Sequence, residues 1–85
     1  MKLYKVSQDI RNGYDTYDSI VVLAKNEDSA RIMHPDGYLV TEKKDLCGDW
    51  VDYENLNKVS ITLLADVGNK LGKEPKVILA SFNAG

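Results

Sequence analysis

The chain has 85 residues, a net charge of −2 at pH 7 and a hydrophobic fraction of 44%. A length of this order predicts one domain, residues 1–85, with a radius of gyration of about 12 Å. The slightly acidic balance argues against a binder of long nucleic acids, because neutralising phosphates requires a dense basic surface. A small anionic ligand needs only two or three donors and is compatible with this charge.

Cysteine content and hydrophobic runs predict the compartment. Cys47 is the only cysteine, which excludes an internal disulfide and a cysteine-based zinc site and fits a reducing cytoplasm. The first residues lack the apolar core of a signal peptide. No apolar run approaches the roughly 20 residues that cross a membrane. We therefore expect a cytoplasmic protein without a membrane partner.

The first predicted element is a β-hairpin turning at Asn12-Gly13, a dipeptide that supplies the positive φ values of a type I′ turn. The second strand is apolar at every position from Ile20 to Ala24, which predicts a strand inside the sheet with both faces covered. Centring the turn on these two residues predicts the pairs Arg11 with Tyr14, Gln8 with Tyr17, Val6 with Ser19, Tyr4 with Val21, and Leu3 with Val22.

A short helix follows the hairpin. Asn26 is a suitable N-cap, and two acidic residues in the first turn suit the helix dipole. Ala30 and Met33 form the inward stripe, and Glu27 with Arg31 is an i,i+4 ion pair. Pro35 disfavours helical backbone at the residue before it, so the helix is expected to end near Met33.

Three further strands are predicted. Residues 38–41 are expected to form a short strand. Residues 42–57 are expected to form a surface excursion that is anchored by Trp50 and Val51, whose side chains plug the core. Residues 66–75 are expected to form a loop. Alternation predicts a strand with Val59, Ile61, Leu63 and Ala65 inward. The nearly continuous apolar run Val77–Phe82 predicts a buried strand. The predicted fold is α+β: an antiparallel or mixed sheet of about five strands with one short helix on one face.

Several segments resemble a family of small proteins encoded by phages, prophages and other mobile elements of bacteria. The resemblance covers about half the chain and lies in Met1–Gln8, Asn12–Ser19, Ala30-Arg31 with His34-Pro35, Gly37-Tyr38, Gly48–Trp50 and Val77–Gly85. It implies a phage-type accessory protein. Such proteins often bind and block a host defence component or sequester a host signalling nucleotide.

No catalytic constellation is recognisable. Asp15 and Asp18 are three apart on a predicted strand and therefore point to opposite faces, which argues against a metal or acid/base pair. His34, the only histidine, has no nucleophile in an elbow motif beside it. Residues 68–73 resemble a phosphate loop, but the glycines are one residue too close. We expect no enzyme, no metal and no cofactor.

The sequence leaves two binding hypotheses. The first is sequestration of a small anionic ligand, such as a linear or cyclic nucleotide, at a site between the subunits of a homo-oligomer. The second is inhibition of a host defence protein through the hairpin, where tyrosines suit interfaces. The candidate ligand-binding residues are Arg11, Asn12, Tyr14, Thr16, Tyr17, Arg31, His34, Trp50, Lys73, Ser81 and Asn83.

Five of these candidates also have a structural interpretation. Tyr14 and Tyr17 can pack at the core or its rim, and Trp50 can plug the core. His34 can cap the helix end, and Lys73 can belong to a solvated loop.

Overall fold

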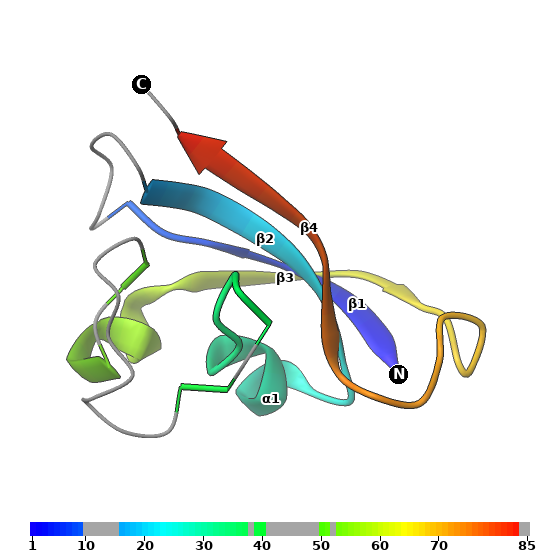
Figure 1. The fold of residues 1–85 in the computed structure, drawn as a ribbon. Helices are drawn as coiled ribbons and strands as arrows, with labels where there is room; N and C mark the ends of the chain where they lie inside the picture. Colours follow the sequence, from blue (N-terminus) through cyan, green and yellow to red (C-terminus); the bar gives the residue numbers. More distant parts are fainter. Residues whose placement is uncertain (10–15, 38, 41–49, 52, 84–85) are drawn as a thin grey trace.

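The computed structural model describes residues 1–9, 16–37, 39–40, 50–51 and 53–83. In this part, four antiparallel strands form a sheet in the order β3-β1-β2-β4 (Figure 1). The strands are β1 (Lys2–Ser7), β2 (Thr16–Ala24), β3 (Ser60–Asp66) and β4 (Lys76–Asn83), and the helices are α1 (Glu27–Arg31) and the 3₁₀ helix η2 (Tyr53–Lys58). The α+β class with one short helix is confirmed, but the described sheet has four strands, not about five.

The hairpin of β1 and β2 is confirmed, but its predicted register is wrong by one residue. Tyr4 pairs with Val22 and Val6 with Ile20, one position further along β2 than the turn predicted. The core explains this difference. All four side chains are buried, whereas a one-residue slip would turn each partner to the other face. The predicted turn at Asn12-Gly13 lies outside the described residues.

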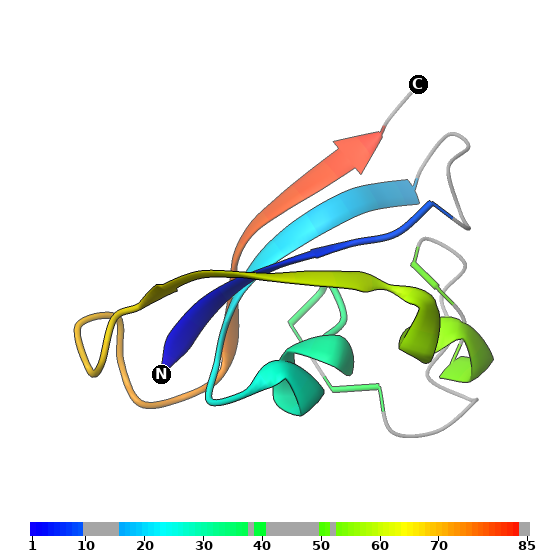
Figure 2. The same cartoon turned by 180° about the vertical axis from the view of Figure 1, so that it is seen from behind.

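The core lies on the sheet face that α1 and η2 cover, as the two opposite views show (Figures 1 and 2). Its buried hydrophobic cluster combines sheet residues with residues of the helices and connecting segments. The cluster comprises Tyr4, Val6, Ile20, Val22, Ala24, Ala30, Met33, Val40, Trp50, Val51, Leu56 and Val59. The predicted plugs Trp50 and Val51 are therefore confirmed as core residues.

Helix α1 begins as predicted and is held by packing as well as by its cap. The Asn26 side chain accepts a hydrogen bond from the Ser29 N–H at 2.9 Å, and Ala30 and Met33 are both buried. The expected ion pair of Glu27 with Arg31 is absent among the described ion pairs. Arg31 donates instead to the Leu56 carbonyl oxygen at 3.3 Å, which joins α1 to η2.

The segment after α1 folds back on the helix end. Tyr38 and Thr41 lie outside the described residues, and Leu39 forms only an isolated bridge with Met33. The Val40 N–H donates to the Ile32 carbonyl at 2.6 Å. This backbone pairing with the helix end, rather than with the sheet, is why the strand predicted at 38–41 is not one of the four.

The predicted surface excursion at 42–57 is wrong in its last part. Residues 41–49 and 52 lie outside the described residues, but η2 occupies 53–58. Leu56 is only 5% exposed and belongs to the hydrophobic cluster. Together with the Arg31 hydrogen bond at its carbonyl, this burial holds η2 against the core.

Edge strand β3 departs from simple alternation. Val59 before it is buried and Ile61 packs against the core, as predicted. Leu63 is 53% exposed and Ala65 is exposed, which contradicts their predicted inward position. The register between β1 and β3 shifts here: Tyr4 pairs with Leu63 and Leu3 with Ala65, which leaves Leu64 without a register partner on β1. Such bulges interrupt pairing and alternation at sheet edges.

Strand β4 forms the other edge, and its predicted burial is wrong. Val77 and Ala80 pack against the core, but Ile78 is 43% and Leu79 65% exposed. Ile78 is the extra residue of a second bulge. The apolar run is therefore split between a core-facing side and a solvent-facing side. Strand β2 lies inside the sheet, as predicted, but the prediction that both of its faces are covered is wrong at Val21, which is only half-buried.

The connection from β3 to β4 joins the two edges of the sheet. It passes the beginning of β1 (Figure 2), where the Val67 N–H donates to the Met1 carbonyl and the Met1 amine donates to the Gly68 carbonyl at 3.1 Å. The sheet end at which β1 finishes is opposite to this connection.

Candidate functional site

A polar cavity of about 250 Å³ lies where β1 ends and β3 begins. The lining residues are Ser7, Gln8, Asp9, Lys58 and Ser60. Ser7 and Ser60 are register partners on neighbouring strands. The cavity therefore depends on the pairing of the first and third strands.

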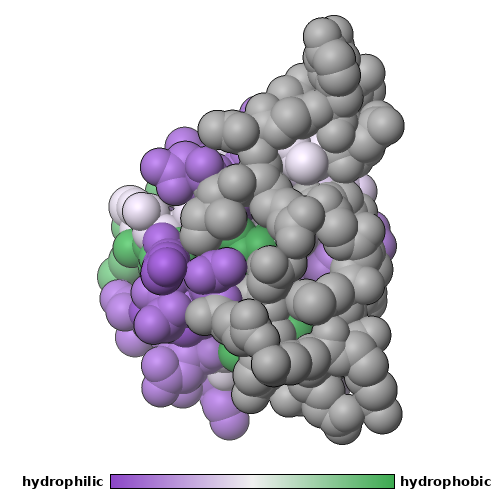
Figure 3. Space-filling model, turned by 90° about the vertical axis from the view of Figure 1, so that its left-hand side faces the viewer, coloured by the Kyte–Doolittle hydropathy of each residue, from purple (hydrophilic) through white to green (hydrophobic). Residues whose placement is uncertain are grey.

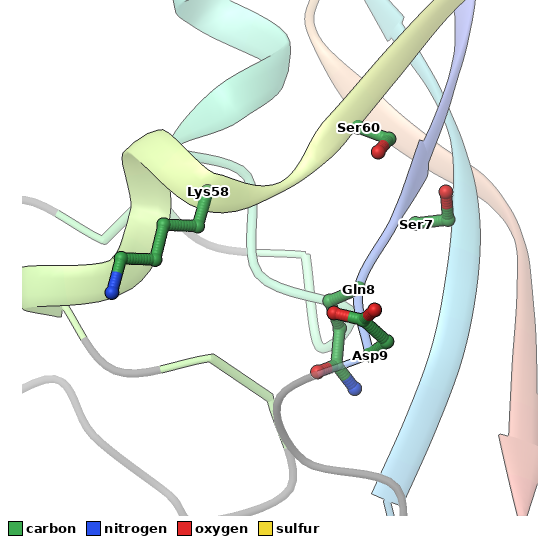
Figure 4. Close-up of a pocket in the computed structure, with 5 residues that line it drawn as sticks. All are labelled: Ser7, Gln8, Asp9, Lys58 and Ser60. Carbon is green, nitrogen blue, oxygen red and sulfur yellow. The ribbon is translucent and has the colours of Figure 1, made fainter.

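The side chains around the cavity come from three elements (Figure 4). Ser7 and Ser60 lie near each other on neighbouring strands, and Gln8 and Asp9 extend beyond the end of β1. Lys58 is the last residue of η2 and directs its amine away from the serines. Its flexible four-carbon stem allows the ammonium to swing toward the cavity.

The polar groups of the cavity suit a ligand with both an anionic group and hydroxyls. The Lys58 ammonium and the serine hydroxyls can donate to an anion, while the Asp9 carboxylate can accept from a hydroxyl or amine. Gln8 is held in place, since its side-chain amide donates to the Tyr17 carbonyl at 2.6 Å and its backbone N–H to the Asp18 carbonyl at 3.0 Å. The end of β1 is thus anchored to β2.

Ser7 and Ser60 lie on the sheet face away from α1, because their neighbours Val6 and Ile61 face the core and successive residues of a strand alternate. The register aligns serines across all four strands of this face: Ser60, Ser7, Ser19 and Ser81. Two residues further along each strand, toward the middle of the sheet, the next row on the same face consists of Thr62, Lys5, Val21 and Leu79. Figure 3 shows another side of the molecule, the left-hand side of Figure 1, where the described hydrophilic residues gather beside smaller hydrophobic areas.

Four of the sequence-predicted site residues cannot be placed as side chains. Arg11, Asn12 and Tyr14 lie outside the described residues. Asn83 is described only in its backbone, which pairs with Thr16. Their predicted roles at the hairpin tip and the C-terminal strand stay predictions.

Five other predicted residues lie in or against the core. Trp50, His34 and Thr16 are at most 6% exposed, and Tyr17 packs against the hydrophobic cluster. Arg31 is half-buried and donates to a backbone carbonyl. These surroundings favour structural roles for all five. They are not among the residues that line the cavity.

His34 illustrates such a structural role. Its Nδ1 accepts a hydrogen bond from the Asp36 N–H at 3.0 Å, and an Asp36 carboxylate oxygen lies 3.7 Å from the same nitrogen. The Gly37 N–H donates to the His34 carbonyl at 2.8 Å. The imidazole therefore organises the turn that follows the helix.

The last two predicted residues, Lys73 and Ser81, are exposed and lie far apart in the fold. Lys73 is in the connection at the beginning of β1, at the sheet end opposite to the cavity. Ser81 is on β4, in the row that contains two cavity serines. Of the predicted residues, Ser81 is therefore the one that shares a row with lining residues of the cavity.

Sequence reasoning missed all five lining residues. Ser7 and Ser60 are separated by more than fifty positions, and nothing local indicates that their strands are neighbours. The sequence contains one weak signal. Ser7 ends a strand two residues before Asp9, and Ser60 begins a strand two residues after Lys58.

Among the described residues, no group of three or more histidine, cysteine, aspartate or glutamate side chains could hold a metal ion. No helix in the described ranges is long and apolar enough to span a membrane. In comparisons with known proteins, no family model, no curated protein and no solved structure matches the chain. The resemblance to mobile-element proteins stays a prediction.

Proposed function

We propose that this protein is a non-enzymatic binder of a small anionic, nucleotide-type ligand, held at the polar cavity between β1 and β3. One observation carries the proposal: a cavity that combines a lysine, a carboxylate, an amide and two paired hydroxyls. This donor and acceptor set suits a phosphate next to a ribose. A carboxylate is the group that nucleotide-binding folds use to accept hydrogen bonds from ribose hydroxyls.

The resemblance to mobile-element proteins favours a signalling nucleotide of host defence as the ligand. Sequestering such a signal in the host cytoplasm needs affinity but no chemistry. The alternative, inhibition of a host protein through the hairpin, has no comparable support in the described residues. At the beginning of β2, Thr16 is buried and Tyr17 packs against the hydrophobic cluster.

Thermal unfolding with a panel of linear and cyclic nucleotides tests the proposal. A ligand at about 100 times its dissociation constant adds roughly 2.7 kcal/mol of stability, which raises the midpoint of a domain this small by about 10 °C or more. No shift with any member at millimolar concentration would contradict the proposal. Size-exclusion chromatography with light scattering tests the expected homo-oligomer in the same samples.

Two lysine variants then locate the site. Lys58→Gln should weaken binding about 10- to 100-fold, because a hydrogen bond to a charged group contributes about 1.5–3 kcal/mol. Lys73→Gln is the matched control, since Lys73 is also an exposed lysine but lies in the connection at the other sheet end. The reverse pattern would place the anion at the connection, where the candidate residue Lys73 lies.

A further inference from the structure

The cavity alone is small for a whole nucleotide. Its 250 Å³ is below the roughly 300–1,000 Å³ of typical ligand pockets. A nucleotide bound there by its phosphate and ribose must therefore extend beyond the lining residues. The face away from α1 is where the side chains of Ser7 and Ser60 direct such an extension.

We infer that this face contains a second subsite, formed by Val21 and Leu79, that receives the base of the nucleotide. The inference rests on the proposed function. Val21 and Leu79 are paired neighbours on β2 and β4. Leu79 is 65% exposed, the most exposed large hydrophobic residue in the described part, and Val21 is half-buried. Together they form an apolar shelf on an otherwise polar row.

The spacing suits a single nucleotide. From Ser7, Val21 lies one strand across and two residues along, a distance of about 8 Å, and Leu79 lies about 12 Å away, from ordinary strand spacing and rise. Lys5, which pairs with Val21, is exposed between the cavity and the shelf. A ligand extended along this diagonal therefore passes a second cation before it reaches the apolar surface.

Among the described residues, the apolar shelf is a better surface for a planar base than any aromatic side chain. Tyr4 and Trp50 are at most 3% exposed, and Tyr17 packs against the core. Those rings are therefore not surfaces on which a base can stack. Contact with Leu79 and Val21 gives a base hydrophobic burial without hydrogen bonds that read its edge. We therefore expect selectivity for nucleotides over sugar phosphates, but weak discrimination among bases.

Titration calorimetry with a nucleoside monophosphate and with ribose 5-phosphate tests the subsite. Wild-type protein should bind the nucleotide at least tenfold more tightly. Leu79→Thr, whose β-branched side chain suits a strand, should remove most of that difference and leave ribose 5-phosphate binding unchanged. Leu71→Thr is the control, since Leu71 is 38% exposed in the distant connection. Nuclear Overhauser contacts from base protons to Leu79 methyl groups provide a direct second readout.

The outcomes separate the two proposals. If Lys58→Gln weakens both ligands but Leu79→Thr changes neither, the base subsite is refuted and the anion site stands. If wild-type protein binds neither ligand, the proposed function fails and the subsite with it. If Leu79→Thr only converts a dimer into monomers with unchanged nucleotide affinity, the shelf is a subunit interface and the inference is overturned.

Discussion

Replacing Trp50 tests whether the segment before η2 is an integral part of the core. Trp50 is 2% exposed and is the largest of the fully buried side chains. Truncating a buried tryptophan to alanine costs about 3–5 kcal/mol. A chain of this length has a total unfolding free energy of about 4–13 kcal/mol. Trp50→Ala should therefore remove a large share of the stability and lower the unfolding midpoint by at least about 12 °C.

Trp50→Phe is the informative companion variant. Nε1 of Trp50 is buried and has no hydrogen-bond partner among the described residues. The Trp50→Phe substitution therefore removes a polar group that contributes little to the free energy of folding. The phenylalanine variant should lose less than half of what the alanine variant loses. Urea unfolding followed by far-UV circular dichroism suits both, because Trp50 is the only tryptophan and fluorescence is lost with it. An alanine variant within about 1 kcal/mol of wild type would refute the role of Trp50 in the core.

Three further predictions concern the segment around α1 and are measured by thermal unfolding. Asn26→Ala should cost about 1 kcal/mol by removing the cap to Ser29, whereas Asn26→Asp should cost little; equal losses would argue against capping. Gly37 has a φ of 98°, and an added Cβ would meet nothing within 4 Å, so Gly37→Ala should cost more than about 1 kcal/mol through backbone conformation alone; an unchanged midpoint would contradict this. His34→Leu should cost about 1–3 kcal/mol, because it removes the acceptor for the Asp36 N–H. His34→Asn can present an oxygen near Nδ1 and should recover part of that loss, while two equally unstable variants would point to ring packing instead.

Local signals in the sequence predicted local structure well. The N-cap at Asn26 and the inward side chains Ala30 and Met33 depend on neighbours within one helical turn, and all three are confirmed. The hairpin was predicted, but its register was not. The register follows burial of Tyr4 and Val6 against β2, a tertiary effect that no local pattern in the sequence reveals.

Features that depend on strand order could not be predicted. The apolar run in β4 is the same sequence whether the strand is central or at an edge, and nothing local predicts that Ile78 and Leu79 are exposed. The cavity likewise requires Ser7 and Ser60 to be neighbours, which follows from the order of strands and from no local pattern. The placement of Trp50 in the core succeeded because a lone large apolar residue in a polar stretch has few other stable positions.

The strand order also determines how this chain must fold. The hairpin of β1 and β2 closes within the first 24 residues, whereas Ser7 meets Ser60 and Thr16 meets Asn83 only across more than fifty intervening positions. Closing such long loops costs entropy before the contacts compensate for it. We expect the hairpin to form first and to serve as the template on which β3 and β4 add independently, one at each side. Substitutions in the hairpin should then slow refolding, while substitutions in β4 should mainly speed unfolding.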